Sequence, residues 1–198
     1  MLEYKAERKK ETSMKKLLCL AAAAALLLSV AACGANGGKD TLTGSPEELL
    51  ARLKEAVTVE LPMSFDSEVT AESAQSALGL TEAQFAEFVE SAYESQAAIT
   101  TIAQSTVLIK CKSVADASEV KKLIAGGYDS RKWICVFPQQ SVVVESGSYV
   151  LLAVGKVEAT DALVEAFRSI SEGNTGSPDV FFTSEGEPEG GDGDLVLF

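Results

Sequence analysis

A short apolar segment near the start of the chain separates an N-terminal targeting signal from the part of the chain that folds. Residues 14–16 give a basic start, Met-Lys-Lys, and residues 17–30 form an apolar run of 14 residues interrupted by one serine. A basic start, an apolar core of this length and small residues after it are typical of a secretory signal peptide. The run is shorter than the about 20 apolar residues that a spanning helix needs. The sequence therefore predicts a signal peptide over residues 14–32, cleaved between Ala32 and Cys33.

Residues 1–13 fit the start of a signal peptide poorly, because they carry Glu3, Glu7 and Glu11. Met14 is the better translation start. We interpret residues 1–13 as an upstream start artefact; the alternative is a real extension that is discarded. In both cases these residues do not contribute to the fold.

The segment Val30-Ala31-Ala32-Cys33 resembles the lipobox of bacterial lipoproteins. The resemblance implies that the Cys33 thiol receives a diacylglyceryl lipid and becomes the first residue of the mature protein. Two acyl chains would hold it stably, since one chain alone binds marginally, at about 0.8 kcal/mol per buried CH₂. The expected location is the extracytoplasmic face of the cell membrane, with the lipid as anchor. The alternative is an ordinary cleaved signal in which Cys33 is incidental.

The chain after the signal peptide is strongly acidic. Residues 33–198 are 166 residues long, which suits one domain with tails, and they carry 11 basic and 26 acidic side chains, a net charge of −15. Such a surface repels nucleic acid and anionic lipid. We therefore expect no nucleic-acid partner, and no membrane contact apart from the lipid.

Several helices and strands have clear local signals. Ser45, Pro46 and Glu48 form a capping box with proline at the first helical position, which predicts a helix through Val57 after a flexible tether over residues 33–44. An extended connector is expected over 60–66. Further predicted elements are a helix over 71–78 ending at Gly79, a strand over 105–113, a helix from Ser113 or Asp116, a hairpin of strands 141–145 and 148–155, and a helix over 161–170.

Two segments stay ambiguous. Residues 85–94 have helical spacing after a cap at Thr81, although they also allow a strand; the pattern favours a helix. The helix after Ser113 either stops at Gly126-Gly127 or runs on to Phe137, and residues 133–137 could instead be a strand.

The expected fold class is α+β, a small antiparallel sheet with helices packed on one face. The single domain is predicted over residues 45–170. Residues 171–198 contain seven acidic side chains, no basic ones and several glycines, so they are predicted to be a disordered acidic tail.

The order of these elements resembles a family of small Gram-positive lipoproteins defined only as a domain of unknown function. The likeness covers about residues 46–170 and is carried by Leu78-Gly79-Leu80-Thr81-Glu82, by the strand at 106–112, by Phe137-Pro138-Gln139-Gln140 and by the segment 147–152. It implies a strand over 85–94 and a long helix through 133–137. The family has no established activity, so it implies no functional residues.

The sequence lacks the residues that most kinds of catalytic site require. The chain has no histidine, which excludes Ser-His-Asp, Cys-His and histidine–metal sites, and Gly126-Gly127 lacks the rest of a phosphate-binding loop. Asp192-Gly193-Asp194 lacks the ligands of a calcium loop. We expect no catalytic residue, no metal and no cofactor beyond the covalent lipid. Cys111 and Cys135 are predicted to be buried free thiols, with a disulfide between them as the alternative.

One group of side chains is a candidate ligand surface. It consists of aromatic residues with one cation beside them, namely Tyr128, Arg131, Trp133, Phe137 and Tyr149. The plainer interpretation, which we favour, is that the rings fill the core between helix and sheet. The sequence thus predicts a non-catalytic envelope module that binds an unknown envelope protein or small ligand. The alternatives are a carboxylate-dependent hydrolase or transferase, and a structural or assembly subunit.

Overall fold

The computed structural model describes residues 41–133 and 135–184. The chain divides into two units, 1–36 and 37–198, and all described residues belong to the second. The predicted signal peptide, Cys33 and residues 185–198 lie outside the described residues. The elements are α2 (Pro46–Ala56), β1 (Ser64–Glu68), α3 (Ala74–Leu78), α4 (Glu82–Phe88), β2 (Val89–Ala97), β3 (Ser105–Cys111), α5 (Val114–Gly127), β4 (Gln140–Ser146), β5 (Tyr149–Gly155), α6 (Val157–Ile170) and β6 (Asp179–Thr183).

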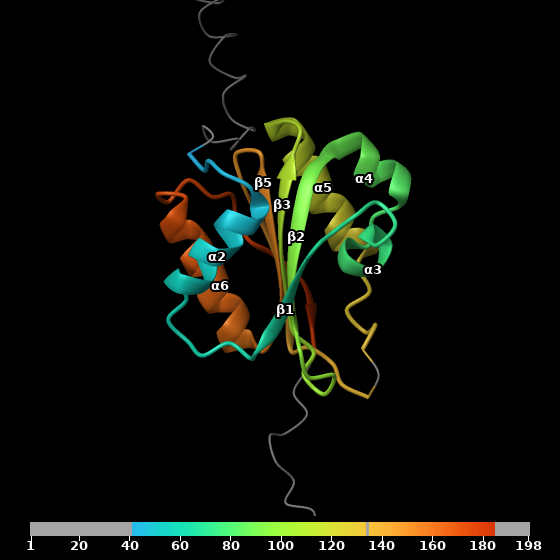
Figure 1. The fold of residues 1–198 in the computed structure, drawn as a ribbon, viewed down its shortest axis with the longest axis vertical. Coiled ribbons are helices and arrows are strands. Elements are labelled where there is room, and N and C mark those ends of the chain that lie inside the picture. The colour runs from blue at the N-terminus through green and yellow to red at the C-terminus, as the bar shows by residue number, and fades with distance from the viewer. Residues whose placement is uncertain (1–40, 134, 185–198) are drawn as a thin grey trace, which may run out of the picture. The chain divides into compact units, whose positions relative to one another are not determined.

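The described strands form one antiparallel sheet in the order β1-β2-β3-β5-β4-β6. The α+β class with a small antiparallel sheet is therefore confirmed. One end of the sheet, here called the Ser184 end, carries the strand ends Ser64, Ala97, Ser105, Gln140, Gly155 and Thr183. The opposite end is called the Thr41 end. It holds the β4–β5 turn, and there the Tyr149 hydroxyl donates to the carbonyl oxygen of Gly44 at 2.8 Å. The Thr41 end is uppermost in Figure 1.

Helices cover both faces of this sheet, so the prediction of helices on one face is wrong. In Figure 1, α2 and α6 lie on one side and α3, α4 and α5 on the other. Alternate residues of β3 belong to two separate buried clusters, with Val107 and Ile109 facing α5 and Leu108 facing α2 and α6. The physical reason is that every residue of β5 and every residue of β3 except Lys110 is buried, and their apolar side chains alternate between the two clusters.

The predicted helix caps are confirmed. Ser45 caps α2 in a full capping box with Glu48, and the Ser113 side chain accepts a hydrogen bond from the backbone N–H of Asp116 at the start of α5. Gly79 ends α3 with a left-handed φ of 73°. Local chemistry sets these boundaries because capping satisfies helix-end N–H groups that have no partner within the helix.

One ambiguous segment differs from the favoured expectation, and the other takes one of the two ends that the sequence left open. Thr81 caps a helix as predicted, but α4 lasts only to Phe88 and β2 then starts at Val89, so residues 85–94 are half helix and half strand. The helix α5 ends at Gly127, and the described residues of 133–137 are neither helix nor strand. The extension implied by the family resemblance is therefore wrong here. Residues 64–66 of the expected connector belong to β1.

The domain also reaches beyond both predicted limits. Leu42 is buried and the Thr41 hydroxyl donates to the carbonyl oxygen of Ser171 at 3.1 Å, so residues 41–44 are packed on the domain rather than part of a tether. At the other limit, β6 pairs with β4 within the segment that was predicted to be disordered. The prediction of a tail starting at residue 171 is wrong for 171–184.

Candidate functional site

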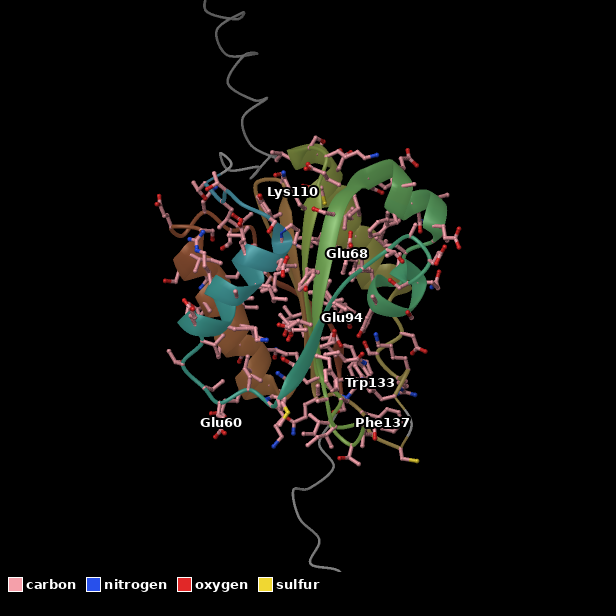
Figure 2. The ribbon with its side chains drawn as sticks, viewed as in Figure 1. Glu60, Glu68, Glu94, Lys110, Trp133 and Phe137 are labelled. Atoms are coloured by element: carbon pink, nitrogen blue, oxygen red, sulfur yellow. The ribbon has the colours of Figure 1, made fainter. Side chains whose placement is uncertain are left out.

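The structure separates the five residues of the predicted ligand surface. Tyr128 and Trp133 pack with the cluster beneath α5, whereas Tyr149 is buried in the cluster on the opposite face of the sheet. Only Arg131 and Phe137 lie together on the surface. Figure 2 places Trp133 and Phe137 near the Ser184 end of the sheet, and Lys110 near the Thr41 end.

Tyr128 and Trp133 are core residues, as the plainer interpretation expected. The Tyr128 ring meets the edge of Phe181 at 6.1 Å between centroids, and the Lys132 ammonium lies 4.9 Å from the Tyr128 ring and 5.0 Å from the Trp133 ring. Burial raises the pKa of the Tyr128 hydroxyl well above its ordinary value. Burial also lowers the pKa of Lys132, although the charges of Glu94 and Asp129 act in the opposite direction. These contacts hold the chain after α5 against β6.

A shallow hollow forms where Arg131 and Phe137 meet the end of β6. Its volume is about 470 Å³ and its lining is Arg131, Phe137, Phe182, Thr183 and Ser184. Phe137 is 59% exposed there. The backbone N–H of Ser184 donates to the carbonyl oxygen of Gln139 at 2.9 Å, which holds the end of the described chain beside the hollow. Arg131 and Phe137 were predicted from the sequence as part of a ligand surface, whereas the β6 residues that complete the wall were not.

Exposed apolar side chains gather at the Ser184 end of the sheet. Five of the six large apolar side chains that are exposed within the described residues flank strand ends there, namely Met63, Phe65, Ile99, Phe137 and Val157. We call these five the apolar end surface. Each of these five side chains leaves apolar surface exposed to water at this end of the sheet. Only Phe137 of these five residues was singled out from the sequence, because the exposure of the other four depends on the fold.

The Ser184 end of the sheet also carries two cations without a described carboxylate partner. Five described cations form ion pairs elsewhere: Lys54, Lys110, Lys121, Lys122 and Arg168. Among the described residues, no carboxylate pairs with Arg131 or with Lys156, which directly follows β5. In a chain with 29 acidic residues, two such cations at one end provide charge complementarity for an acidic group.

A polar network between α2 and β1–β2 is the nearest approach to catalytic chemistry in the described part. The Lys54 ammonium donates to both Asp66 carboxylate oxygens at 3.0 and 3.1 Å and to the hydroxyls of Ser64 and Ser95. The Ser95 hydroxyl donates to Asp66 at 2.7 Å. Lys54 and Asp66 form an ion pair at 3.0 Å, so each of these charged groups has the other as its partner. The adjoining cavity of about 10 Å³ has room for one water. This network joins α2 to the sheet.

The same network gives a pH-dependent prediction. Burial alone would raise the pKa of Asp66, but hydrogen bonds from Ser95 and Lys54 together with the Lys54 charge outweigh it, so the pKa lies below its usual 3.8. A lowered carboxyl pKa stabilises the fold above pH 3.8, and this stabilisation is lost as pH falls through the lower folded value. Because Asp66 is partly exposed, Asp66→Asn should cost at most about 1 kcal/mol at pH 7. Thermal unfolding should show that this cost is smaller at pH 2.5 than at pH 7, and an equal cost at both pH values would contradict the prediction.

The two cysteines of the domain are free, and only one is buried as predicted. Cys111 lies in the core, and burial raises its pKa to about 12. Cys135 is exposed, with a positive φ of 63°. The thiolate is the reactive species. Iodoacetamide at pH 8 should therefore alkylate Cys135 in the folded protein and leave Cys111 unmodified until urea is added, as peptide mass mapping would reveal. Equal labelling of both before unfolding would contradict the assignment.

Within residues 41–133 and 135–184 there is no group of three or more acidic or cysteine side chains that could hold a metal ion. No helix in that same part is long and apolar enough to cross a membrane. Comparison of the chain with protein-family models, curated proteins and solved structures finds no match. The resemblance to a lipoprotein family therefore stays a prediction from the sequence.

Proposed function

We propose that this chain is a lipid-anchored extracytoplasmic module that binds a protein partner through the apolar end surface. The observation that carries the proposal is the position of five exposed apolar side chains and two cations without described carboxylate partners at the same end of the sheet. Exposed apolar side chains and cations at one end of the sheet suit a partner that presents apolar side chains together with acidic groups.

The way the chain joins the domain supports this proposal. A lipid on Cys33 would be connected to the domain through Thr41, which is bonded to Ser171 at the Thr41 end. The central strands have seven residues each, and at about 3.4 Å per residue they are about 24 Å long. The apolar end surface is thus the part of the sheet farthest from the point where the tether attaches, which leaves it accessible to a partner.

Site-specific photo-crosslinking tests the proposal in the lipidated protein in its native membrane. A benzophenone side chain at Ile99, in the apolar end surface, should give one adduct of defined mass. The matched control is Glu87, which is exposed at the end of α4 beside the Thr41 end and should give none. No adduct at Ile99, or the same adducts at both positions, would overturn the binding role. The anchor has its own test, because Cys33→Ser should release the protein from the membrane fraction; a membrane-retained, lipid-labelled variant would refute it.

A further inference from the structure

We propose that the outer edge of β1 binds an extended strand of the protein partner, in which basic side chains alternate with apolar side chains. The inference rests on the proposed function, because Phe65 on β1 and Met63, which directly precedes β1, both belong to the apolar end surface. It adds how the partner is held, namely as a further strand of the sheet, and which side chains that strand presents.

Backbone hydrogen-bonding groups line the outer edge of β1. Among the described strands only β2 pairs with β1, which is the first strand of the sheet (Figure 1). The Met63 carbonyl oxygen accepts a hydrogen bond from the N–H of Ala98 at 2.8 Å. Further along, the Val69 N–H donates to the carbonyl oxygen of Ala92 at 2.9 Å. Such groups alternate along an antiparallel pair, so the residues whose N–H and C=O groups point away from β2 are Ser64, Asp66 and Glu68.

The pairing of β1 with β2 is regular, which keeps these outward groups in line. Its register continues without a shift along all five residues of β1, whereas the pairing of β6 with β4 shifts between Ser141 and Val142. A bulge of that kind twists an edge strand away from further pairing. Of the two edge strands in the described sheet, β1 is therefore the one whose backbone suits the addition of another strand.

The side chains on the α2 side of β1 are acidic. Asp66 forms an ion pair with Lys54 of α2, and side chains two residues apart on a strand share a face, so Glu68 lies on the same side. Glu68 is exposed and forms no ion pair with the described residues. Opposite charges in cross-strand pairs stabilise a sheet. An added strand is therefore favoured when its basic side chains lie opposite Asp66 and Glu68.

The opposite side of β1 carries apolar side chains. Met63 and Phe65 are 76% and 72% exposed, the two highest values among the exposed large apolar side chains of the described residues. They lie two residues apart and so share a face, which is not the face of Asp66. Apolar side chains at alternate positions of an added strand would cover them and remove apolar surface from water. The two faces of β1 together select a strand in which basic and apolar side chains alternate.

Charge identifies the occupant as a strand of the partner rather than a second copy of β1. A second copy would bring two acidic edges together, in a chain that carries 29 acidic and 17 basic side chains. Charges on an edge strand oppose its pairing with itself and leave it open to a strand of the opposite charge. Arg131 lies beside β6 at the other edge of the sheet, where the acidic groups of the same partner would bind.

Hydrogen exchange with a designed peptide tests the inference on the full-length protein in a neutral detergent. The probe is Lys-Val-Lys-Val-Lys-Val-Lys with blocked ends, and the control peptide is Lys-Lys-Val-Val-Val-Lys-Lys, which has the same charge without the alternation. The probe should slow exchange about fivefold or more at the amides of residues 64, 66 and 68, and less at residues 65 and 67, which already face β2. No slowing, equal slowing by both peptides, or equal slowing at all five residues would overturn the inference.

Two substitutions at Glu68 separate the charge from the backbone. Glu68→Gln removes the charge and should weaken binding of the probe about two- to fivefold, the usual range for a cross-strand charge pair. Glu68→Pro also removes an N–H that points away from β2, so it should weaken binding further. Glu87→Gln on α4 is the matched control, because Glu87 is another exposed glutamate. Equal weakening by Glu68→Gln and Glu87→Gln, or equal binding by the two Glu68 variants, would overturn the inference. Circular dichroism checks that each variant is folded.

The remaining outcomes separate this inference from the proposed function and from self-association. Crosslinks from Ile99 in the native membrane report the partner itself, so their presence without slowing at β1 would overturn this inference alone. Slowing at β1 without crosslinks from Ile99 would overturn the apolar end surface as the partner site and support the pairing at β1. If residues 64, 66 and 68 become protected as the protein concentration rises without peptide, a second copy occupies the edge and the assignment to a partner is wrong.

Discussion

Replacing Gly79 by alanine is expected to destabilise the domain by about 2–5 kcal/mol. Gly79 has a φ of 73°, where an L side chain costs about 1–2 kcal/mol. A Cβ atom there would lie 2.4 Å from the carbonyl carbon of Gly127 and 2.4 Å from the backbone nitrogen of Tyr128. These are backbone atoms, so the ends of α3 and α5 would have to separate, and overpacking of this kind costs about 1–3 kcal/mol more. Urea unfolding should show a lower midpoint with an unchanged slope.

Gly126 provides the matched control, one residue before the contact. A Cβ atom on Gly126 would meet nothing within 4 Å, and the residue lies inside α5. Gly126→Ala should therefore stabilise the protein by about 0.5–1 kcal/mol, because alanine loses less backbone entropy in a helix. If Gly79→Ala and Gly126→Ala shift the midpoint in the same direction, the close backbone contact does not have the role assigned to it.

Local signals predicted most of the elements because local chemistry decides them. The capping residues Ser45, Thr81 and Ser113 stand at the starts of α2, α4 and α5, and Gly79 ends α3. Local signals could not show that helices cover both faces of the sheet. Continuous burial in β3 and β5 removes the alternation that identifies a solvent-facing side, so the choice between one covered face and two is made by packing.

Long-range contacts explain why β6 was missed. Its segment is rich in glycine and acidic residues, and β6 itself has only five residues. Other parts of the chain hold it. The Gly176 backbone N–H donates to the Glu145 carbonyl oxygen at 2.9 Å, and Glu145 forms a 2.6 Å ion pair with Lys121 on α5. Phe181 then packs on Tyr128. None of these partners is near β6 in the sequence. The composition of the whole segment therefore predicted disorder and gave no sign of the strand.

Only part of the candidate site could be predicted from the sequence, because long-range contacts bring the rest of it together. Arg131 and Phe137 stand six residues apart in an irregular segment, and sequence reasoning grouped them correctly. It also grouped them with Tyr149, which the alternation of β5 turns to the opposite face. Phe182 joins them only because β6 pairs with β4. A surface made from strand ends requires the register of the sheet, which no single segment of sequence contains.

Replacing Phe167 by alanine should cost about 3–5 kcal/mol, the usual range for a fully buried aromatic residue. Phe167 has 0% exposure and is among the largest fully buried side chains of the described domain. It lies on α6 in the same cluster as Leu49 and Leu53 of α2. Removing the ring leaves a cavity between two helices and the sheet. Val157→Ala on the same helix is the control, since Val157 is 42% exposed, and it should change the free energy of unfolding by less than about 0.5 kcal/mol.

A double variant with one substitution in each buried cluster tests whether the two faces of the sheet unfold together. Ile124 is fully buried in the other cluster, and Ile124→Val should cost about 0.5–1.5 kcal/mol. Because the sheet separates Ile124 from Phe167, the two costs should add within about 0.5 kcal/mol. Unfolding should nevertheless remain one transition, because β3 and β5 contribute side chains to both clusters and neither face can lose its strands alone. Two separate transitions in the double variant, by fluorescence and circular dichroism, would show that the faces fold independently.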